Sequence, residues 1–141
     1  MTKKEKIIFI CTANACRSQI AEGIMKTIAG DKFDVYSAGS HPTKVHPMSI
    51  KVMNEIGIDI SSQSSDLISN FLDERMDIVI TVCDNANETC PIFPGKVERI
   101  HWNIDDPFKR WVSDSHDLVN FRKTREDLSR RINDLLSIRF V

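Results

Sequence analysis

Cys11-Thr12-Ala13-Asn14-Ala15-Cys16-Arg17-Ser18 is a CX5RS stretch that lies between a short apolar run and a helical pattern. Residues 6–10 (KIIFI) are mostly β-branched or aromatic, which predicts a buried strand. After Ser18, apolar residues recur with helical period until Gly30, at Ile20, Ile24, Met25 and Ile28. A loop between a strand end and a helix start can aim successive backbone N–H groups at one point. The stretch therefore predicts an oxyanion cradle in an α/β fold.

The residue types in this loop suit an attack by sulfur on a bound oxyanion. The positive end of the helix dipole stabilises a thiolate, so we expect Cys11 to ionise more readily than a free cysteine. Arg17 carries a rigid fork of donors that would clamp two oxygens of the anion, and Ser18 would hydrogen-bond the Cys11 sulfur. The expected oxyanion-binding residues are Thr12, Ala13, Asn14, Ala15, Cys16, Arg17 and Ser18. The alternative is a buried structural cysteine in front of a basic helix start.

The length and composition are those of an ordinary globular domain. We expect one domain over 1–141, because 141 residues can build a self-sufficient core. The formal net charge of −1 gives no electrostatic reason to expect nucleic acid or a membrane surface as the partner. The apolar run near the start is too short for a signal peptide or a spanning helix. We expect a cytoplasmic monomer, whose four cysteines serve catalysis, redox chemistry or metal binding.

Predicted strands and helices alternate along the chain. Further strands are predicted over 33–37, 77–82 and 97–101, and a short helix over 66–72. Another helix opens at His46-Pro47, carries apolar residues as far as Ile56 and is capped by Gly57. A C-terminal helix carries Phe121, Leu128, Ile132 and Leu135 on one stripe. The alternation predicts a three-layer fold, a four-stranded parallel sheet flanked by helices, which binds ligands at the carboxyl ends of its strands.

A second group of candidate residues follows the strongest predicted strand. Cys83 and Cys90 form a CX6C pair whose connecting residues are polar and turn-prone. Two such cysteines near Cys11 would suit a disulfide relay, because each exchange needs a thiolate in line with an accessible sulfur. Zinc is an alternative, since four cysteines and His101 are enough ligands, but the spacing lacks the tight CX2C pattern of zinc knuckles. Inert cysteines are the remaining interpretation.

A third candidate is the pair of carboxylates in His101-Trp102-Asn103-Ile104-Asp105-Asp106-Pro107. Removing an oxygen from a tetrahedral oxyanion requires a proton donor, and a carboxylic acid held over the cradle supplies one. Asp106, fixed by Pro107, is the better candidate, and like-charge repulsion from Asp105 would raise the pKa of its carboxyl group. The alternative is an ordinary polar turn.

Together these motifs resemble the thioredoxin-coupled arsenate reductases, which share the fold of the low-molecular-weight protein tyrosine phosphatases. The resemblance covers nearly the whole chain, through CTANACRSQIAEG, YSAGS, IDISSQSSDLI, ITVC…CPIFP and HWNIDDP. It implies Cys11 as nucleophile, Arg17 as oxyanion clamp and Asp106 as general acid. It also implies Cys83 and Cys90 as the relay pair, with a Cys11–Cys83 disulfide as intermediate and a Cys83–Cys90 disulfide as the final product.

The resemblance further implies arsenate as substrate, thioredoxin as reductant and no obligatory cofactor. Glutaredoxin with glutathione is the alternative reductant. A tyrosine phosphatase using the same CX5R loop is the rival function, and the aromatic Phe108 after Asp106-Pro107 suits a tyrosyl ring. A zinc- or arsenic-binding regulator is a non-enzymatic rival, although nothing in the chain resembles a DNA-reading module.

Three features in or beside the loop raise separate questions. Some reductases of this family bind potassium beside the loop, and Asn14, Glu22, Ser37 and Asp66 match those positions with oxygen ligands. Ala13 replaces the family's usual glycine, which would strain the loop if that position needs a positive φ. Cys16 matches a family cysteine outside the relay, and we expect its side chain to pack in the interior.

Overall fold

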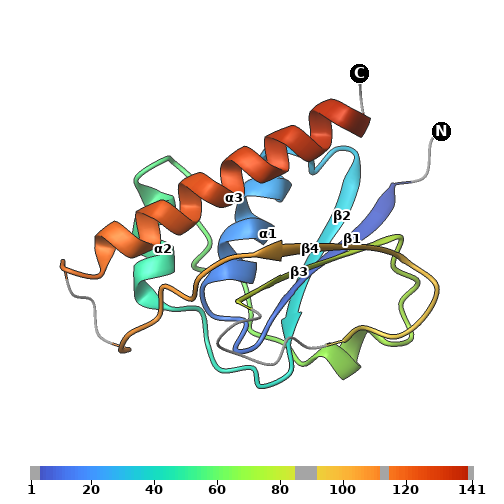
Figure 1. Ribbon diagram of the computed structural model, residues 1–141, viewed down its shortest axis with the longest axis horizontal. Helices are drawn as coiled ribbons and strands as arrows, with labels where there is room; N and C mark the ends of the chain where they lie inside the picture. The colour runs from blue at the N-terminus through green and yellow to red at the C-terminus, as the bar shows by residue number, and fades with distance from the viewer. Residues whose placement is uncertain (1–3, 85–91, 112–114, 140–141) are drawn as a thin grey trace.

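Four strands form one parallel sheet in the order β2-β1-β3-β4 (Figure 1). They are β1 (Glu5–Cys11), β2 (Phe33–Gly39), β3 (Ile78–Cys83) and β4 (Glu98–Asn103). The computed structural model describes residues 4–84, 92–111 and 115–139. The central strands β1 and β3 are almost entirely buried, as expected for strands covered on both faces. The predicted parallel α/β architecture is confirmed.

In the described part of the chain, three α-helices lie on one face of this sheet. They are α1 (Arg17–Ala29), α2 (Pro47–Asn54) and α3 (Leu118–Arg139). Helices α2 and α3 pack on α1, and α3 lies across α1 in Figure 1. The main core forms between these helices and the strand side chains on this face, such as Ile7, Phe9 and Ile80. A smaller core on the opposite face joins Ile8 and Ile10 to a short 3-10 helix, η1 (Ile68–Phe71), and to the segment around Phe93.

The strand order places β1 and β3 at the topological switch point of the sheet. The chain crosses from β1 to β2 on one side and continues to β3 and β4 on the other. Loops after β1 and β3 therefore diverge to opposite sides and leave a crevice at the carboxyl ends, where ligands bind in such sheets. Cys11 is the last residue of β1 and Cys83 is the last residue of β3. The sheet thus gathers both candidate groups at one edge.

The local details differ from the sequence pattern at several points. Helix α2 ends at Asn54, and one expectation is met just beyond it, because Gly57 closes the helix with φ of 78°. Its N–H bonds the Asn54 carbonyl and the Ile58 N–H bonds the Met53 carbonyl, which is the predicted glycine cap. Ile28, which the helical pattern placed on the apolar stripe of α1, is 45% exposed, and Ile56, expected among the apolar residues of the second helix, is 46% exposed. The predicted helix over 66–72 is only the one-turn η1, so the second face of the sheet is covered mainly by irregular segments.

Within the described ranges, no helix is both long enough and apolar enough to cross a membrane.

Candidate active site

The loop after β1 holds its carbonyl groups outward against the surrounding segments. The carbonyl of Thr12 accepts from the His41 N–H at 2.9 Å, and that of Ala15 accepts from the His46 N–H at 3.0 Å. Between them, the Ala13 carbonyl accepts from Thr43 and from the Ser65 hydroxyl. The Asn14 carbonyl accepts from the side-chain amide of Gln19. Since the C=O and N–H of a trans peptide point in opposite directions, the N–H groups of residues 13–16 turn away from these partners. This is the arrangement that an oxyanion cradle needs.

Asn14 provides the backbone turn that closes the cradle. Its φ of 48° lies in the left-handed region, and no other non-glycine residue among those that the structure describes has a positive φ. Asparagine tolerates this region better than most residues. Ala13 does not adopt it, so the expected strain at Ala13 is absent. Asn14 is fully buried, and its side chain donates to Ser18 at 2.7 Å and to Ser37 at 3.0 Å.

Cys11 lies at the floor of the cradle with its predicted hydroxyl partner. Its Sγ is 2.9 Å from the Oγ of Ser18, which confirms the predicted hydrogen bond. Ser18 also accepts the bond from Asn14, so its hydroxyl hydrogen is available to the sulfur. A hydroxyl that donates to sulfur stabilises the thiolate form. The chain of contacts from Asn14 through Ser18 therefore orients a donor toward Cys11, the predicted nucleophile.

Arg17 reaches from the start of α1 to the opposite wall of the site. Its side chain is 2% exposed, and one terminal nitrogen donates to the Ile104 carbonyl at 3.0 Å. The other terminal nitrogen lies 3.5 Å from the Asp106 carboxylate. The structure thus brings the predicted clamp and the predicted acid together above Cys11.

A cavity of about 270 Å³ opens above Cys11. Arg17 and Asp106 contribute polar groups to its wall, while Ala13, Ala15, Phe108 and Trp111 make much of the remainder apolar. Phe108 and Trp111 meet edge to face, with ring centroids 4.9 Å apart. Asp105 does not line this cavity but lines a neighbouring one, so the structure separates the roles of the two carboxylates.

The other cysteines lie in contrasting environments. Cys16 is buried in the main core, as expected, and burial raises the pKa of its thiol well above the ordinary range. Cys83 is also buried and is disulfide-bonded, whereas Cys11 and Cys16 are free. The Sγ of Cys83 lies 3.9 Å from the carbonyl oxygen of Ile10, the residue before Cys11 on β1. Cys90, its predicted relay partner, lies outside the described residues.

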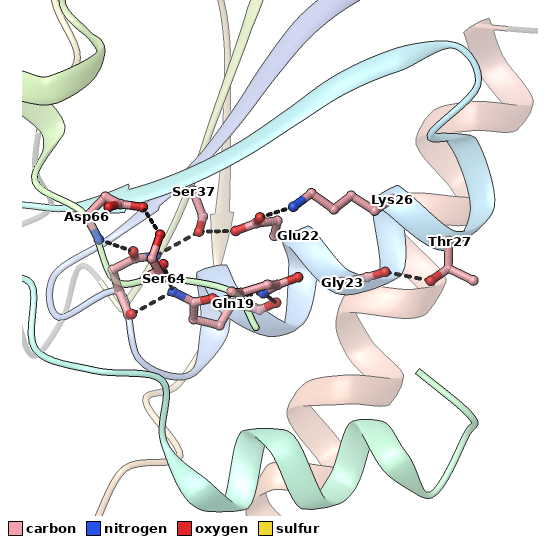
Figure 2. Close-up of polar contacts among 10 residues, drawn as sticks. Gln19, Glu22, Gly23, Lys26, Thr27, Ser37, Ser64 and Asp66 are labelled. Carbon is pink, nitrogen blue, oxygen red and sulfur yellow. Dashed lines mark hydrogen bonds and ion pairs between the residues drawn. The ribbon is translucent and has the colours of Figure 1, made fainter. Parts of the chain in front are cut away.

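Glu22, Ser37 and Asp66, three of the four residues predicted for potassium, lie in one polar cluster (Figure 2), and hydrogen bonds join Asn14 to it. Ser37 donates to Glu22 at 2.5 Å and accepts from Asn14, whose side-chain oxygen accepts from the Asp66 N–H at 2.8 Å. Lys26 donates to the other Glu22 oxygen at 2.5 Å. The cluster holds carboxylate, hydroxyl and amide oxygens, a donor set that suits a hard cation.

Within the part of the chain that the structure describes, no group of three or more His, Cys, Asp and Glu side chains could hold a metal ion.

Several residues that support the site were not singled out from the sequence. A Cβ on Gly39 would lie 2.4 Å from the Thr12 carbonyl oxygen, so only glycine lets β2 end against the cradle. Gln19 donates to the Asn14 carbonyl and to Ser64, and so ties the cradle to the segment after α2. Gly39 lies in the YSAGS motif and Gln19 directly follows Ser18. Their places within or next to these motifs are the sequence feature that could have identified them as supporting residues.

Known proteins are similar to this chain over nearly its whole length. The family model for low molecular weight phosphotyrosine protein phosphatase matches residues 6–139. An arsenate reductase of Halalkalibacterium halodurans is 46% identical over 129 residues, which cover 92% of this chain and 93% of that protein.

Solved structures agree with this assignment. An arsenate reductase in the phosphate binding state has a TM-score of 0.79 at 37% identity, covering 94% of this chain and 97% of that chain. A thioredoxin-dependent arsenate reductase of Corynebacterium glutamicum has a TM-score of 0.73 at 28% identity, covering 96% of this chain and 62% of that chain. The chain belongs to the low molecular weight phosphotyrosine protein phosphatase family and resembles the arsenate reductases within it.

Proposed function

We propose that this protein is an arsenate reductase that uses Cys11 as nucleophile and is regenerated through a cysteine relay. The observation that carries the proposal is the convergence of Cys11, Arg17 and Asp106 on one cavity at the switch point of the sheet. The likeness to arsenate reductases over 92% of the chain supports arsenate as the substrate.

The first step is attack on arsenic inside the cradle. The Cys11 thiolate forms a sulfur–arsenic bond, and one arsenate oxygen departs with a proton from Asp106. The cradle N–H groups, the α1 terminus and the Arg17 guanidinium stabilise the negative charge on the remaining oxygens. Arsenate would draw the Arg17 fork away from Asp106, which frees the acid to face the departing oxygen.

The second step reduces arsenic with electrons from two thiols. The Cys83 thiolate attacks the Cys11 sulfur, the sulfur–arsenic bond breaks with its electron pair going to arsenic, and arsenite leaves. A Cys11–Cys83 disulfide remains, which the Cys90 thiolate resolves into Cys83–Cys90 with Cys11 as leaving group. The disulfide bonding of Cys83 beside a free Cys11 supports this order, because the relay ends with Cys11 as a free thiol.

The relay requires the end of β3 to move. Cys11 belongs to the core on the helical face of the sheet, together with Val82. Since neighbouring residues of a strand point to opposite faces, Cys83 points to the other face. Cys83 must therefore come around the end of the sheet to reach Cys11.

Thioredoxin is the proposed reductant of the final disulfide. The Corynebacterium glutamicum protein of the same fold is described as thioredoxin-dependent, which supports this choice over glutaredoxin with glutathione. We also propose a monomer in the cytoplasm, where thiols are kept reduced.

The experiment is a coupled assay with arsenate, thioredoxin, thioredoxin reductase and NADPH. Arsenate-dependent NADPH oxidation is expected for the wild type and absent from Cys11→Ser. A wild type that binds oxyanions but shows no arsenate-dependent turnover would contradict the proposal. Replacing thioredoxin by glutaredoxin and glutathione separates the two candidate reductants.

A weak aryl phosphatase activity is a second proposed function. The aromatic wall of Phe108 and Trp111 beside the cradle favours it, because a phenyl ring could pack there while its phosphate occupies the cradle. Such hydrolysis needs Cys11 and Asp106 but no relay. We therefore expect Cys83→Ser to keep aryl phosphate hydrolysis while losing repeated arsenate turnover, and loss of both activities would argue against this function.

Potassium binding beside the cradle remains a prediction. Asn14, Glu22, Ser37 and Asp66 would hold the ion, whose charge would support the Asn14 end of the loop. Lys26 already pairs with Glu22 and would compete for that carboxylate. We expect potassium chloride to raise the melting temperature more than sodium chloride at equal ionic strength, and Glu22→Gln to abolish the difference. Equal effects of the two salts on the wild type would contradict binding.

A further inference from the structure

His46 joins three segments that surround the cavity. Its backbone N–H donates to the Ala15 carbonyl of the cradle at 3.0 Å. Its Nδ1 accepts from the Met48 N–H at 3.0 Å and so caps α2, while its Nε2 donates to the Arg110 carbonyl at 2.6 Å. The residue is fully buried. One residue thus connects the cradle, through its backbone, with the α2 terminus and the segment that carries Asp106, through its ring.

These two ring contacts fix the state of the imidazole. An N–H group of Met48 faces Nδ1, which must therefore be the unprotonated acceptor. A carbonyl oxygen faces Nε2, which must therefore carry the hydrogen. His46 is held as the neutral tautomer with its hydrogen on Nε2, which uses both nitrogens as structural ties.

The ring of His46 also supports the aromatic wall of the cavity. Trp111 stacks on it with centroids 5.2 Å apart and an interplanar angle of 17°, and Phe108 meets its edge at 5.4 Å. Phe121 of α3 packs against the same ring at 5.0 Å. The imidazole therefore couples the wall of the cavity to the main core.

The segment 104–111 is anchored on both sides of the predicted acid. Arg17 holds the Ile104 carbonyl before Asp106, and His46 holds the Arg110 carbonyl after it. Asp106 itself is 44% exposed in its side chain and accepts from the Phe108 N–H at 3.0 Å. Its direction therefore depends on how these two anchors hold the segment.

We propose that His46 is a positioning residue for the reaction, which ties segment 104–111 to α2 so that Asp106 and the aromatic wall face the oxyanion above Cys11. This role rests on the proposed arsenate reduction. His46 touches no substrate in this scheme and acts only through the segment that it holds.

The variant His46→Asn removes the hydrogen bond to the Arg110 carbonyl but keeps the cap of α2. Asparagine is among the best N-cap residues, so α2 keeps a side-chain acceptor for the Met48 N–H. Its side chain is too short to span to the Arg110 carbonyl, and it offers no ring to Trp111. His101→Asn is the matched control, because His101 is an exposed histidine that bonds Thr81 on the sheet.

The first measurement is a double-mutant cycle with Asp106→Asn. We expect His46→Asn to lower kcat for arsenate about tenfold while leaving iodoacetamide alkylation of Cys11 unchanged. In the Asp106→Asn background the same substitution should lower kcat hardly further, because the carboxylic acid that His46 would position is already absent. An equal loss in both backgrounds would show that His46 acts elsewhere.

The second measurement does not depend on turnover. Trp102→Phe leaves Trp111 as the sole tryptophan of the chain. In that background His46→Asn should raise acrylamide quenching of Trp111 at least about twofold, since the ring stacked on the indole is removed, and His101→Asn should leave quenching unchanged. Unchanged quenching in His46→Asn overturns the proposed tie. A wild type without arsenate turnover would instead contradict the proposed function. The quenching comparison would still test whether His46 holds segment 104–111.

Discussion

The guanidinium of Arg17 lies 3.5 Å from the carboxylate of Asp106, across the cavity that has Cys11 at its floor. The two groups come from segments far apart in the chain, the start of α1 and the loop after β4. Each has a separate task in the proposed reaction, since Arg17 binds the oxyanion and Asp106 protonates the departing oxygen. Their contact shows that both reach the same point above the nucleophile.

Asp106→Asn should lower kcat for arsenate by about 100-fold, because a positioned general acid contributes at least that factor. Iodoacetamide alkylation of Cys11 should continue at the wild-type rate, since that reaction has no oxygen to protonate. Steady-state kinetics and mass spectrometry check the two expectations.

Asp105→Asn is the matched control for this substitution. The neighbouring carboxylate lines a different cavity and is absent from the wall above Cys11. Its kcat should stay within about twofold of the wild type, as for a surface substitution away from the chemistry. A loss as large as that of Asp106→Asn would contradict the assignment of the acid.

Cys16 should remain a thiol at neutral pH and take no part in the relay. Burial is the main cause that raises the pKa of its thiol, and thiolates are the reactive form. Peptide mapping after brief iodoacetamide treatment at pH 8 should find Cys11 modified and Cys16 intact. Cys16→Ala should keep arsenate turnover at a cost of about 1 kcal/mol in stability; loss of turnover in a folded variant would assign Cys16 a chemical role.

Gly39→Ala should disrupt the cradle. The added Cβ would lie 2.4 Å from the Thr12 carbonyl oxygen and 2.9 Å from the Cys11 carbonyl oxygen, and both are backbone atoms that cannot yield cheaply. We expect arsenate turnover to fall by more than about tenfold, because small displacements of a reacting group are costly.

Gly57→Ala distinguishes this effect from general destabilisation. Gly57 has φ of 78° with nothing within 4 Å of an added Cβ, so alanine there brings backbone strain of about 1–3 kcal/mol without touching the site. Its melting temperature should fall while turnover below that temperature persists. Equal activity losses in the two variants would mean that Gly39 matters only for stability.

Glu55 links the end of α2 to α3, and the link should depend on pH. Hydrogen bonds from Arg122 and then Arg125 lower the pKa of Glu55 to about 2. A depressed folded-state pKa contributes stability above the unfolded value of roughly 4.3, and this contribution is lost as pH falls toward 2. The unfolding free energy of Glu55→Gln should therefore lie below that of the wild type at pH 7, with a gap that closes between about pH 4.5 and 2. A gap independent of pH would contradict the ion pairs.

The fold and the convergence of Cys11, Arg17 and Asp106 on one cavity could be predicted from the sequence because each leaves a local signal. The apolar run before Cys11 and the CX5RS stretch identify a strand, a loop and a helix without any distant contact. The same holds for Asp106, whose position after a strand end brought it to the cavity where it was expected.

Residues whose role depends on distant contacts could not be predicted in this way. His46 was recognisable only as the residue before the helix-opening Pro47, because its partner Arg110 lies 64 positions further along the chain. The left-handed turn falls on Asn14 rather than Ala13 because the Asn14 side chain finds partners on α1 and β2 that a local pattern does not reveal.

Disulfide mapping after a single arsenate turnover is the direct test of the proposed order of the three cysteines. Fully reduced protein is mixed with one equivalent of arsenate in the absence of thioredoxin, quenched with acid and digested. We predict one equivalent of arsenite, a Cys83–Cys90 disulfide and free Cys11 in the wild type, with Cys11–Cys83 in Cys90→Ser. No arsenite, or a wild-type disulfide that joins Cys11 to Cys16 or to Cys90, would contradict this prediction.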